Sequence, residues 1–123
     1  MLEVTLDAPD SAGEGECIPF TVILTNRSDS PLHMHLQGRD IIFDVSIEDN
    51  EGKVVWHRLA GSFTQAILRL DTFAPGEVRR LHSQWDQRAS NGKPVNRGSY
   101  FARASVPTES GVLESQPRVL KLT

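Results

Sequence analysis

The chain has 123 residues, 38% of them hydrophobic, and one cysteine, which limits it to one domain with one core and excludes an internal disulfide. Its formal net charge of −3 at pH 7 is unevenly distributed. Residues 1–52 carry eleven acidic and two basic side chains, whereas residues 53–123 carry five acidic and eleven basic ones. No basic block with interleaved aromatic residues is present, so this asymmetry predicts pairing between strands and no nucleic-acid partner.

The first third of the chain alternates apolar and polar residues and therefore predicts half-buried strands. Leu2, Val4 and Leu6 alternate with polar residues, and residues 18–24 and 32–36 continue the same period. The start of the chain has neither the basic region nor the apolar run of a signal peptide, so we expect a cytoplasmic protein without membrane contact, unless a leader has been removed. Cys17 is interpreted as a small apolar filler without chemistry of its own.

The middle of the chain predicts a hairpin followed by an ambiguous segment. Residues 43–47 alternate, and the turn residues of EDNEGK lead into a second strand, VVWHRL. In the stretch SFTQAILRLDTFAPGE, Ser62–Glu77, the first half has apolar residues at helical spacing, whereas Pro75 and Gly76 suit the centre of a type II turn between strands. The short length argues against a full helix, so we expect one short helical turn at most.

The last third of the chain again predicts strands. VRRLHSQW reads as a strand, Gln87–Arg97 is the longest loop, and residues 100–106 and 117–122 form the closing strands. Roughly seven to nine short strands without a long helix predict an all-β, antiparallel sandwich that spans residues 1–123 as a single domain. The aromatic residues beside these strands are expected to anchor the core: Trp56, Phe63, Trp85 and Tyr100. Tyr100 resembles the tyrosine whose hydroxyl bonds to the backbone at a sandwich corner.

Candidate catalytic and metal-binding groups are sparse. His33 and His35 point to the same side of one predicted strand and could share a metal, but two ligands do not make a site. The segments GSF and RGSY lack the Gly-x-Ser-x-Gly pattern of a nucleophile elbow, and glycines scattered singly at turns form no phosphate-binding loop. We therefore expect no enzyme activity, no catalytic residue, no metal and no cofactor.

Several segments in order resemble the intracellular proteinase inhibitor domain of the BsuPI type. They are LTNRSDSPLHMHL, FDVSIEDNEGKVVWHR, SFTQAILRLDTFAPGE, SQWD and RGSYFARASV, and the resemblance runs from about Val4 to the end of the chain. Its most specific pieces are Phe63–Ala66, Gly76-Glu77 before Trp85, and Gly98-x-Tyr100. The resemblance implies an immunoglobulin-like β-sandwich and inhibition of an intracellular serine proteinase of the subtilisin type. It also implies that Ser62–Glu77 is mostly extended, with the Gln65 amide satisfying backbone groups.

The leading hypothesis is a non-enzymatic, protein-binding module that inhibits such a proteinase through one loop. Arg88–Gly98 is long and exposed, but it is polar and has no apolar anchor at its centre, which suits a substrate better than an inhibitor. We therefore expect the contact to lie in the segment LAGSF, which comprises Leu59, Ala60, Gly61, Ser62 and Phe63. The alternatives are an immunoglobulin-like accessory or adhesion module without a proteinase target, and a small metal-binding protein that uses His33 and His35.

Overall fold

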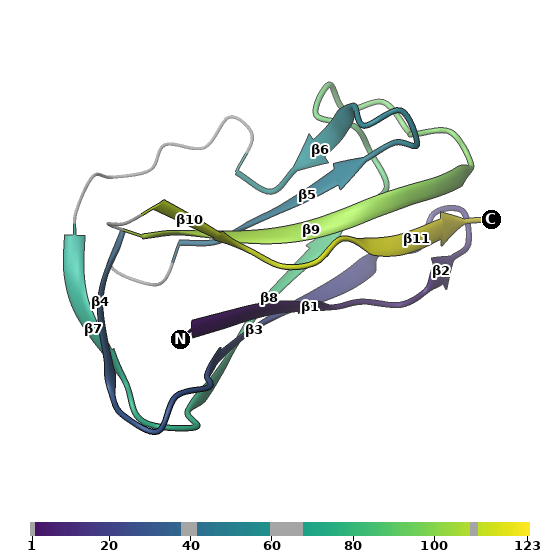
Figure 1. Ribbon diagram of the computed structural model, residues 1–123. Helices are drawn as coiled ribbons and strands as arrows, with labels where there is room; N and C mark the ends of the chain where they lie inside the picture. Colours follow the sequence, from purple (N-terminus) through teal and green to yellow (C-terminus); the bar gives the residue numbers. More distant parts are fainter. Residues whose placement is uncertain (1, 38–41, 60–67, 109–110) are drawn as a thin grey trace.

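The chain forms a sandwich of two mainly antiparallel sheets in the computed structural model, which describes residues 2–37, 42–59, 68–108 and 111–123 (Figure 1). Its strands are β1 (Leu2–Asp7), β2 (Ser11–Ala12), β3 (Ile18–Asn26), β4 (Leu32–Gln37), β5 (Asp44–Glu48), β6 (Val54–His57), β7 (Leu68–Phe73), β8 (Val78–Trp85), β9 (Gly98–Thr108), β10 (Gly111–Glu114) and β11 (Arg118–Leu122). None of the described residues belongs to a helix that is long and apolar enough to cross a membrane. The predicted all-β sandwich is confirmed.

The smaller sheet has the strand order β1-β3-β8, and the larger sheet is organised around β9. One edge of β9 pairs with β11 over residues 98–102 and with β10 over residues 105–108. The other edge pairs with β5 over residues 101–105 and with β4 at Thr108. The sheets hold more strands than the sequence predicts, because short edge segments such as the two-residue β2 form strands of their own.

The core lies between the sheets and follows the predicted alternation. Its fully buried members come from both layers: Ile18, Val22, Leu24, Val45, Ile47, Phe73, Ala102, Ala104 and Val106. The interpretation of Cys17 as a small apolar filler is wrong, because Cys17 is exposed. Ile18 and Phe20 face the core, and the period of two then directs the residue before Ile18 outward.

Three of the four predicted aromatic anchors meet at one end of the core. Trp85 is 1% exposed, and its ring centroid lies 5.7 Å from that of Trp56 and 6.4 Å from that of Tyr100. The Tyr100 hydroxyl donates a hydrogen bond to the Asn96 carbonyl at 2.7 Å, which confirms the predicted corner. Burial raises the pKa of this hydroxyl, so it keeps its proton and its role as donor. Phe63 lies outside the described residues.

The long loop after β8 is more ordered than its polar sequence predicts. Gln87 is 2% exposed with a φ of 65°, and its Nε2 donates to the carbonyls of Gly13 and Glu16 at 2.7 and 2.8 Å. Val95 packs against the core and donates its backbone N–H to the Gln87 carbonyl at 3.1 Å. The loop therefore has an apolar anchor at Val95, which lies beyond the centre of Arg88–Gly98 and was not predicted.

The charges of the two halves of the chain pair only in part as predicted. Arg118 contacts Asp10 at 3.2 Å, and Arg103 contacts Glu48 at 3.9 Å, so both pairs join the acidic half to the basic half. The ion pairs of Arg79 instead lie within the basic half. The asymmetry is thus distributed over the surface by the interleaving of strands.

The turn between β7 and β8 carries the chain from the larger sheet to the smaller one. The Glu77 N–H donates to the Ala74 carbonyl at 2.9 Å, and Gly76 has a φ of 73°. A positive φ at this position is what a type II turn requires, and it favours glycine. The predicted Pro75-Gly76 turn is therefore confirmed, and the described part of Ser62–Glu77, from Leu68 onward, is extended.

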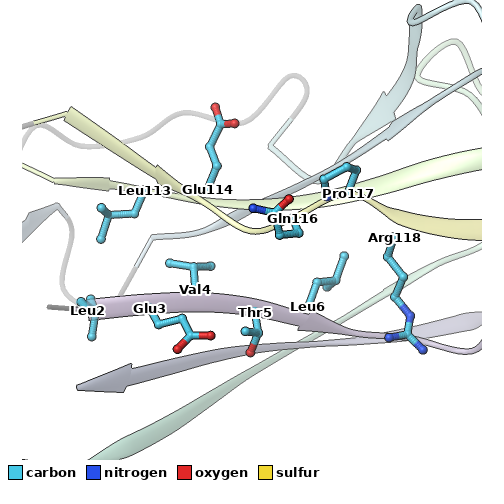
Figure 2. A pocket seen from close by; sticks show the side chains of 10 residues that line it. All are labelled: Leu2, Glu3, Val4, Thr5, Leu6, Leu113, Glu114, Gln116, Pro117 and Arg118. Carbon is cyan, nitrogen blue, oxygen red and sulfur yellow. The ribbon is translucent and has the colours of Figure 1, made fainter. Parts of the chain in front are cut away.

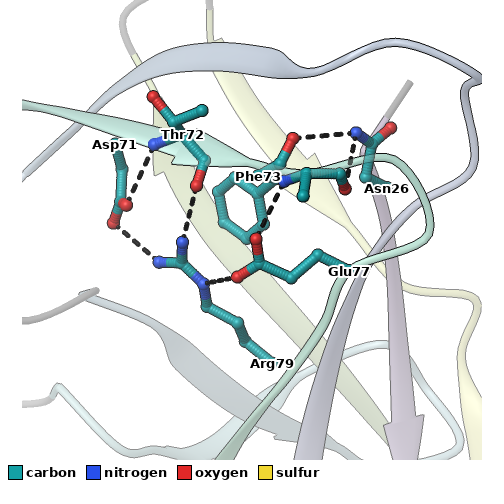
Figure 3. Close-up of polar contacts among 7 residues, drawn as sticks. Asn26, Asp71, Thr72, Phe73, Glu77 and Arg79 are labelled. Atoms are coloured by element: carbon teal, nitrogen blue, oxygen red, sulfur yellow. Dashed lines mark hydrogen bonds and ion pairs between the residues drawn. The ribbon is translucent and has the colours of Figure 1, made fainter.

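Asn26 ties this turn to the end of β3 from a position that is 1% exposed (Figure 3). Its side-chain Nδ2 donates to the carbonyls of Phe73 and Ala74 at 3.0 and 3.1 Å. Its backbone N–H donates to the Glu77 carbonyl, and its own carbonyl accepts from the Gly76 N–H, both at 3.0 Å. One residue therefore satisfies backbone groups on both sides of the crossing between the sheets.

Arg79 closes the same crossing from the solvent side (Figure 3). Its guanidinium contacts Glu77 Oε2 at 2.6 Å and Asp71 Oδ2 at 2.9 Å, and it lies 4.1 Å from the centroid of the Phe73 ring. The second oxygen of Glu77 accepts from the Ala74 N–H at 2.8 Å. The Arg79 hydrogen bond, and then the Ala74 N–H, hold the pKa of Glu77 below its usual value.

Replacing Asn26 by alanine should destabilise the fold strongly. The substitution leaves the Phe73 carbonyl without its side-chain donor in a buried environment, and an unsatisfied buried polar group costs about 1–3 kcal/mol. Urea denaturation should therefore show that the free energy of unfolding of Asn26→Ala is about 1–3 kcal/mol lower than that of wild type. The control is Asn50→Ala at the exposed tip of the β5–β6 hairpin, which should be nearly neutral. Equal effects of the two substitutions would contradict the role given to Asn26.

The lowered pKa of Glu77 predicts a contribution to stability that depends on pH. A carboxyl group with a depressed pKa in the folded state stabilises the fold above its ordinary value of 4.5, and this contribution is lost as the pH falls through the folded pKa. Wild type should exceed Glu77→Gln in stability at about pH 7, and the difference should shrink at about pH 3. Urea denaturation at both pH values measures it. A difference that stays constant with pH would mean that the charge of Glu77 contributes nothing.

Candidate functional site

The segment predicted to contact a partner begins directly after β6, at the edge of the larger sheet. Leu59 is half-buried and is the only member of the segment that the described residues include. Ala60, Gly61, Ser62 and Phe63 lie outside them, and the described chain resumes at Leu68 in β7. The geometry around Leu59 therefore defines how the segment leaves the sandwich.

Asp44, the first residue of β5, holds the chain on both sides of Arg58. Its Oδ1 accepts a hydrogen bond from the Leu59 N–H at 3.1 Å, and its Oδ2 lies 3.0 Å from Nδ1 of His57. Hydrogen bonds to a carboxylate are stronger than those between neutral groups. The carboxylate thus fixes the backbone at the point where the predicted contact segment starts.

Arg58 adds a second attachment, directed to the residue before Asp44. Its guanidinium lies 3.9 Å from the centroid of the buried Phe43 ring, and its Nη1 donates to the Phe43 carbonyl at 2.7 Å. A cation placed over an aromatic face is attracted by the ring quadrupole. We call this group of five residues, Phe43, Asp44, His57, Arg58 and Leu59, the Asp44 clamp.

The clamp forms where the backbone hydrogen bonds between β5 and β6 end and the side chain of Asp44 provides the next acceptor. Ser46 pairs with His57, and the Arg58 N–H still donates to the Val45 carbonyl at 3.0 Å. The next N–H along the chain, that of Leu59, bonds to the side chain of Asp44 and not to a backbone carbonyl of β5. A side-chain acceptor at the end of a ladder satisfies a backbone donor and redirects the chain.

The sequence does not reveal the clamp, although each of its members is visible in it. A β-bulge between Ile47 and Glu48 shifts the register of the hairpin, so counting back from the turn at Asp49–Gly52 does not bring Asp44 opposite Leu59. The sequence signal that could have found it is a carboxylate at the start of one strand of a hairpin and a histidine-arginine pair at the end of the other.

The two histidines of the possible metal site lie on β4. His33 Nδ1 is 3.0 Å from Thr72 Oγ1, in keeping with the cross-strand pairing of the two residues. His35 pairs in backbone register with Leu70. Over the described ranges, no group of three or more histidine, cysteine, aspartate or glutamate residues is arranged to hold a metal ion.

The competing loop, Arg88–Gly98, folds into a small hairpin of its own. Arg88 forms an isolated antiparallel bridge with Pro94, and the Ala89 N–H donates to the Lys93 carbonyl at 2.8 Å. The Ser90 N–H donates to the Val55 carbonyl at 3.0 Å, which attaches the loop to β6. This loop therefore supports the hairpin from which the Asp44 clamp is built.

Comparison with known proteins identifies one family. The model of the intracellular proteinase inhibitor family, BsuPI, matches residues 3–111. A search of curated proteins finds no match.

Solved structures show the same fold at low identity. A CARDB domain from Pyrococcus furiosus, solved in complex with di-metal ions, has 15% identity and a TM-score of 0.54 over 99% of this chain and 92% of that chain. The sporulation control protein Spo0M from Bacillus subtilis has 11% identity and a TM-score of 0.61 over 98% of this chain and 49% of that one. These similarities support the immunoglobulin-like sandwich and carry no information on activity.

Removing the carboxylate of the clamp should loosen the start of the contact segment. Asp44→Ala deletes the acceptor of the Leu59 N–H, and loss of a hydrogen bond to a charged group, about 1.5–3 kcal/mol, should raise amide exchange at Leu59 by about tenfold or more. Hydrogen exchange followed by NMR measures the rate. Asp44→Asn keeps an oxygen acceptor, so its exchange rate at Leu59 should lie between those of wild type and Asp44→Ala.

The matched control is Asp86→Ala, which removes a carboxylate that accepts from the Arg88 N–H in another loop. It should leave exchange at Leu59 unchanged. If Asp44→Ala and Asp86→Ala have the same exchange rate at Leu59, the clamp does not hold this backbone.

Proposed function

We propose, because the chain belongs to the intracellular proteinase inhibitor family, that it binds and inhibits an intracellular serine proteinase of the subtilisin type. The family match over residues 3–111 carries this proposal. In this proposal the protein is a binding module, and the proteinase supplies all of the catalytic chemistry.

We further propose that the segment Leu59–Phe63 makes the contact. A subtilisin-like cleft accepts an extended segment that pairs with its edge strands and places apolar side chains in pockets. The observation that supports this choice is the Asp44 clamp, which fixes the direction of the chain at Leu59. A segment whose first residue is held before binding loses less conformational entropy there on association, which favours inhibition over cleavage.

One alternative keeps the fold and gives up the proteinase. The immunoglobulin-like fold, which a CARDB domain shares over 99% of this chain and 92% of its own length, is also compatible with an accessory or adhesion module. The two functions differ in one measurable property, which is inhibition of a subtilisin-type enzyme.

Titration of a panel of subtilisin-type intracellular proteinases tests the proposal. Wild type should inhibit at least one of them, and Leu59→Asp should weaken inhibition by about tenfold or more, because a central interface anchor contributes about 2 kcal/mol or more and about 1.4 kcal/mol is tenfold. The matched control is Leu70→Asp on β7, where the same change is made at a leucine that is 61% exposed. Lys93→Ala tests the competing loop in the same assay.

Each outcome separates one part of the proposal from another. Equal inhibition by wild type and Leu59→Asp would show that the contact lies elsewhere, and a loss confined to Lys93→Ala would move it to the Arg88–Gly98 loop. Failure of wild type against the whole panel would leave the accessory module as the function.

A further inference from the structure

A groove separates the edge of the smaller sheet from the wall formed by β10 and the start of β11 (Figure 2). Its volume is about 420 Å³, which falls within the range of pockets that bind small ligands and peptides. One wall is contributed by Leu2, Glu3, Val4, Thr5 and Leu6 of β1, and the other by Leu113, Glu114, Gln116, Pro117 and Arg118. None of these residues belongs to the Asp44 clamp.

The β1 wall is a strand edge. Five consecutive residues, 2–6, line the groove, whereas the face of a strand would contribute only every second residue. Within the described part of the chain, β1 pairs with β3 alone. Alternate backbone N–H and C=O groups of an edge strand point away from its partner and remain available to another strand. The groove therefore offers backbone hydrogen bonds along its length.

The groove has apolar side chains on both walls, together with the carboxylates of Glu3 and Glu114. Val4 and Leu6 point from β1 toward the opposite wall but are only 7% and 8% exposed, and Leu113 points back toward β1 (Figure 2). Leu113 is only partly buried against the core, so apolar surface stays open at this position. An occupant with apolar side chains at alternate positions would cover this surface while its backbone pairs with β1.

Arg118 stands at the end of the groove next to Leu6 (Figure 2). Its Nη2 contacts Asp10 at 3.2 Å, but the side chain of Asp10 is 93% exposed, and such surface pairs contribute little. Its Nε is buried and has no hydrogen-bond partner among the described residues. The guanidinium can therefore exchange Asp10 for a carboxylate that arrives through the groove, and arginine binds a carboxylate with two parallel hydrogen bonds.

We propose that this groove binds the C-terminal end of an extended apolar peptide, which adds a strand to β1 and places its terminal carboxylate against Arg118. The peptide runs parallel to β1, because its carboxyl end must lie beside Leu6. Five residues of β1 span about 16 Å, which accommodates four or five residues of the peptide. This site goes beyond the proposed inhibition of a proteinase and is independent of it, since it shares no residue with Leu59–Phe63.

Binding of one peptide in two chemical forms tests the proposal. The probe is the acetylated hexapeptide Ser-Val-Thr-Val-Thr-Leu, prepared with a free C-terminal carboxylate and as the C-terminal amide, and titrated into the full chain while amide resonances are followed by NMR. The free acid should bind about tenfold or more tightly than the amide, as expected for loss of a charge-assisted hydrogen bond. The amide shifts should concentrate in residues 2–6 and 113–118.

Two variants test the role of the guanidinium. Arg118→Gln should bring the free acid down to the affinity of the amide, whereas Lys121→Gln, which removes an equal charge from an exposed position on β11, should keep the preference. The comparison of acid with amide on wild type needs no variant, so it decides the question even if Arg118→Gln fails to fold.

Three results would overturn the proposal. They are equal binding of the acid and the amide, no binding of either form, and shifts that lie outside the groove. Shifts in residues 2–6 that depend on protein concentration without peptide would assign the edge to a second copy of this chain. Proteinase inhibition is measured separately, so failure here leaves that function untouched.

Discussion

The arrangement of this sandwich depends on satisfying the backbone where the chain crosses from one sheet to the other. At the crossing between β7 and β8, the buried Asn26 side chain donates to the carbonyls of Phe73 and Ala74, where the backbone leaves the regular ladder. Buried carbonyls without donors are costly, so a polar side chain in the core is here a condition of the fold. Arg79 and Glu77 protect the same point from solvent, and the two sheets are thereby held in one relative position.

The residues of the family resemblance that the structure describes have structural roles of this kind. Asn26 closes the crossing, Gly76 provides the positive φ of the turn, and Tyr100 anchors the corner of the sandwich. None of these three residues belongs to the Asp44 clamp or to the segment that begins at Leu59. These residues of the family pattern therefore account for the fold, and a shared fold does not by itself determine the surface that would meet a partner.

The sequence predicted the strands and the core well because both depend on a local period of two. Val45 and Ala104 could be placed inside from their neighbours alone, and both are fully buried. Features that depend on register or on distant partners could not be predicted in the same way. The Asp44 clamp requires the bulge at Ile47, and Gln87 requires the carbonyl of Gly13, which lies far from it in the chain. Cys17 shows the opposite error, since a residue-type preference was given more weight than the alternation beside it.

The central place of β9 in the larger sheet has a consequence for the order of events during synthesis. Val45 of β5 pairs with Ala104, and Leu36 of β4 pairs with Thr108, so both strands gain a partner on that side only after β9 has been synthesised. Until β9 leaves the ribosome, β4 and β5 expose unpaired edges and apolar faces, which are the features that lead to aggregation. Folding of the larger sheet is therefore dominated by long-range contacts, which form slowly, and the edges of β4 and β5 stay open until β9 pairs with them.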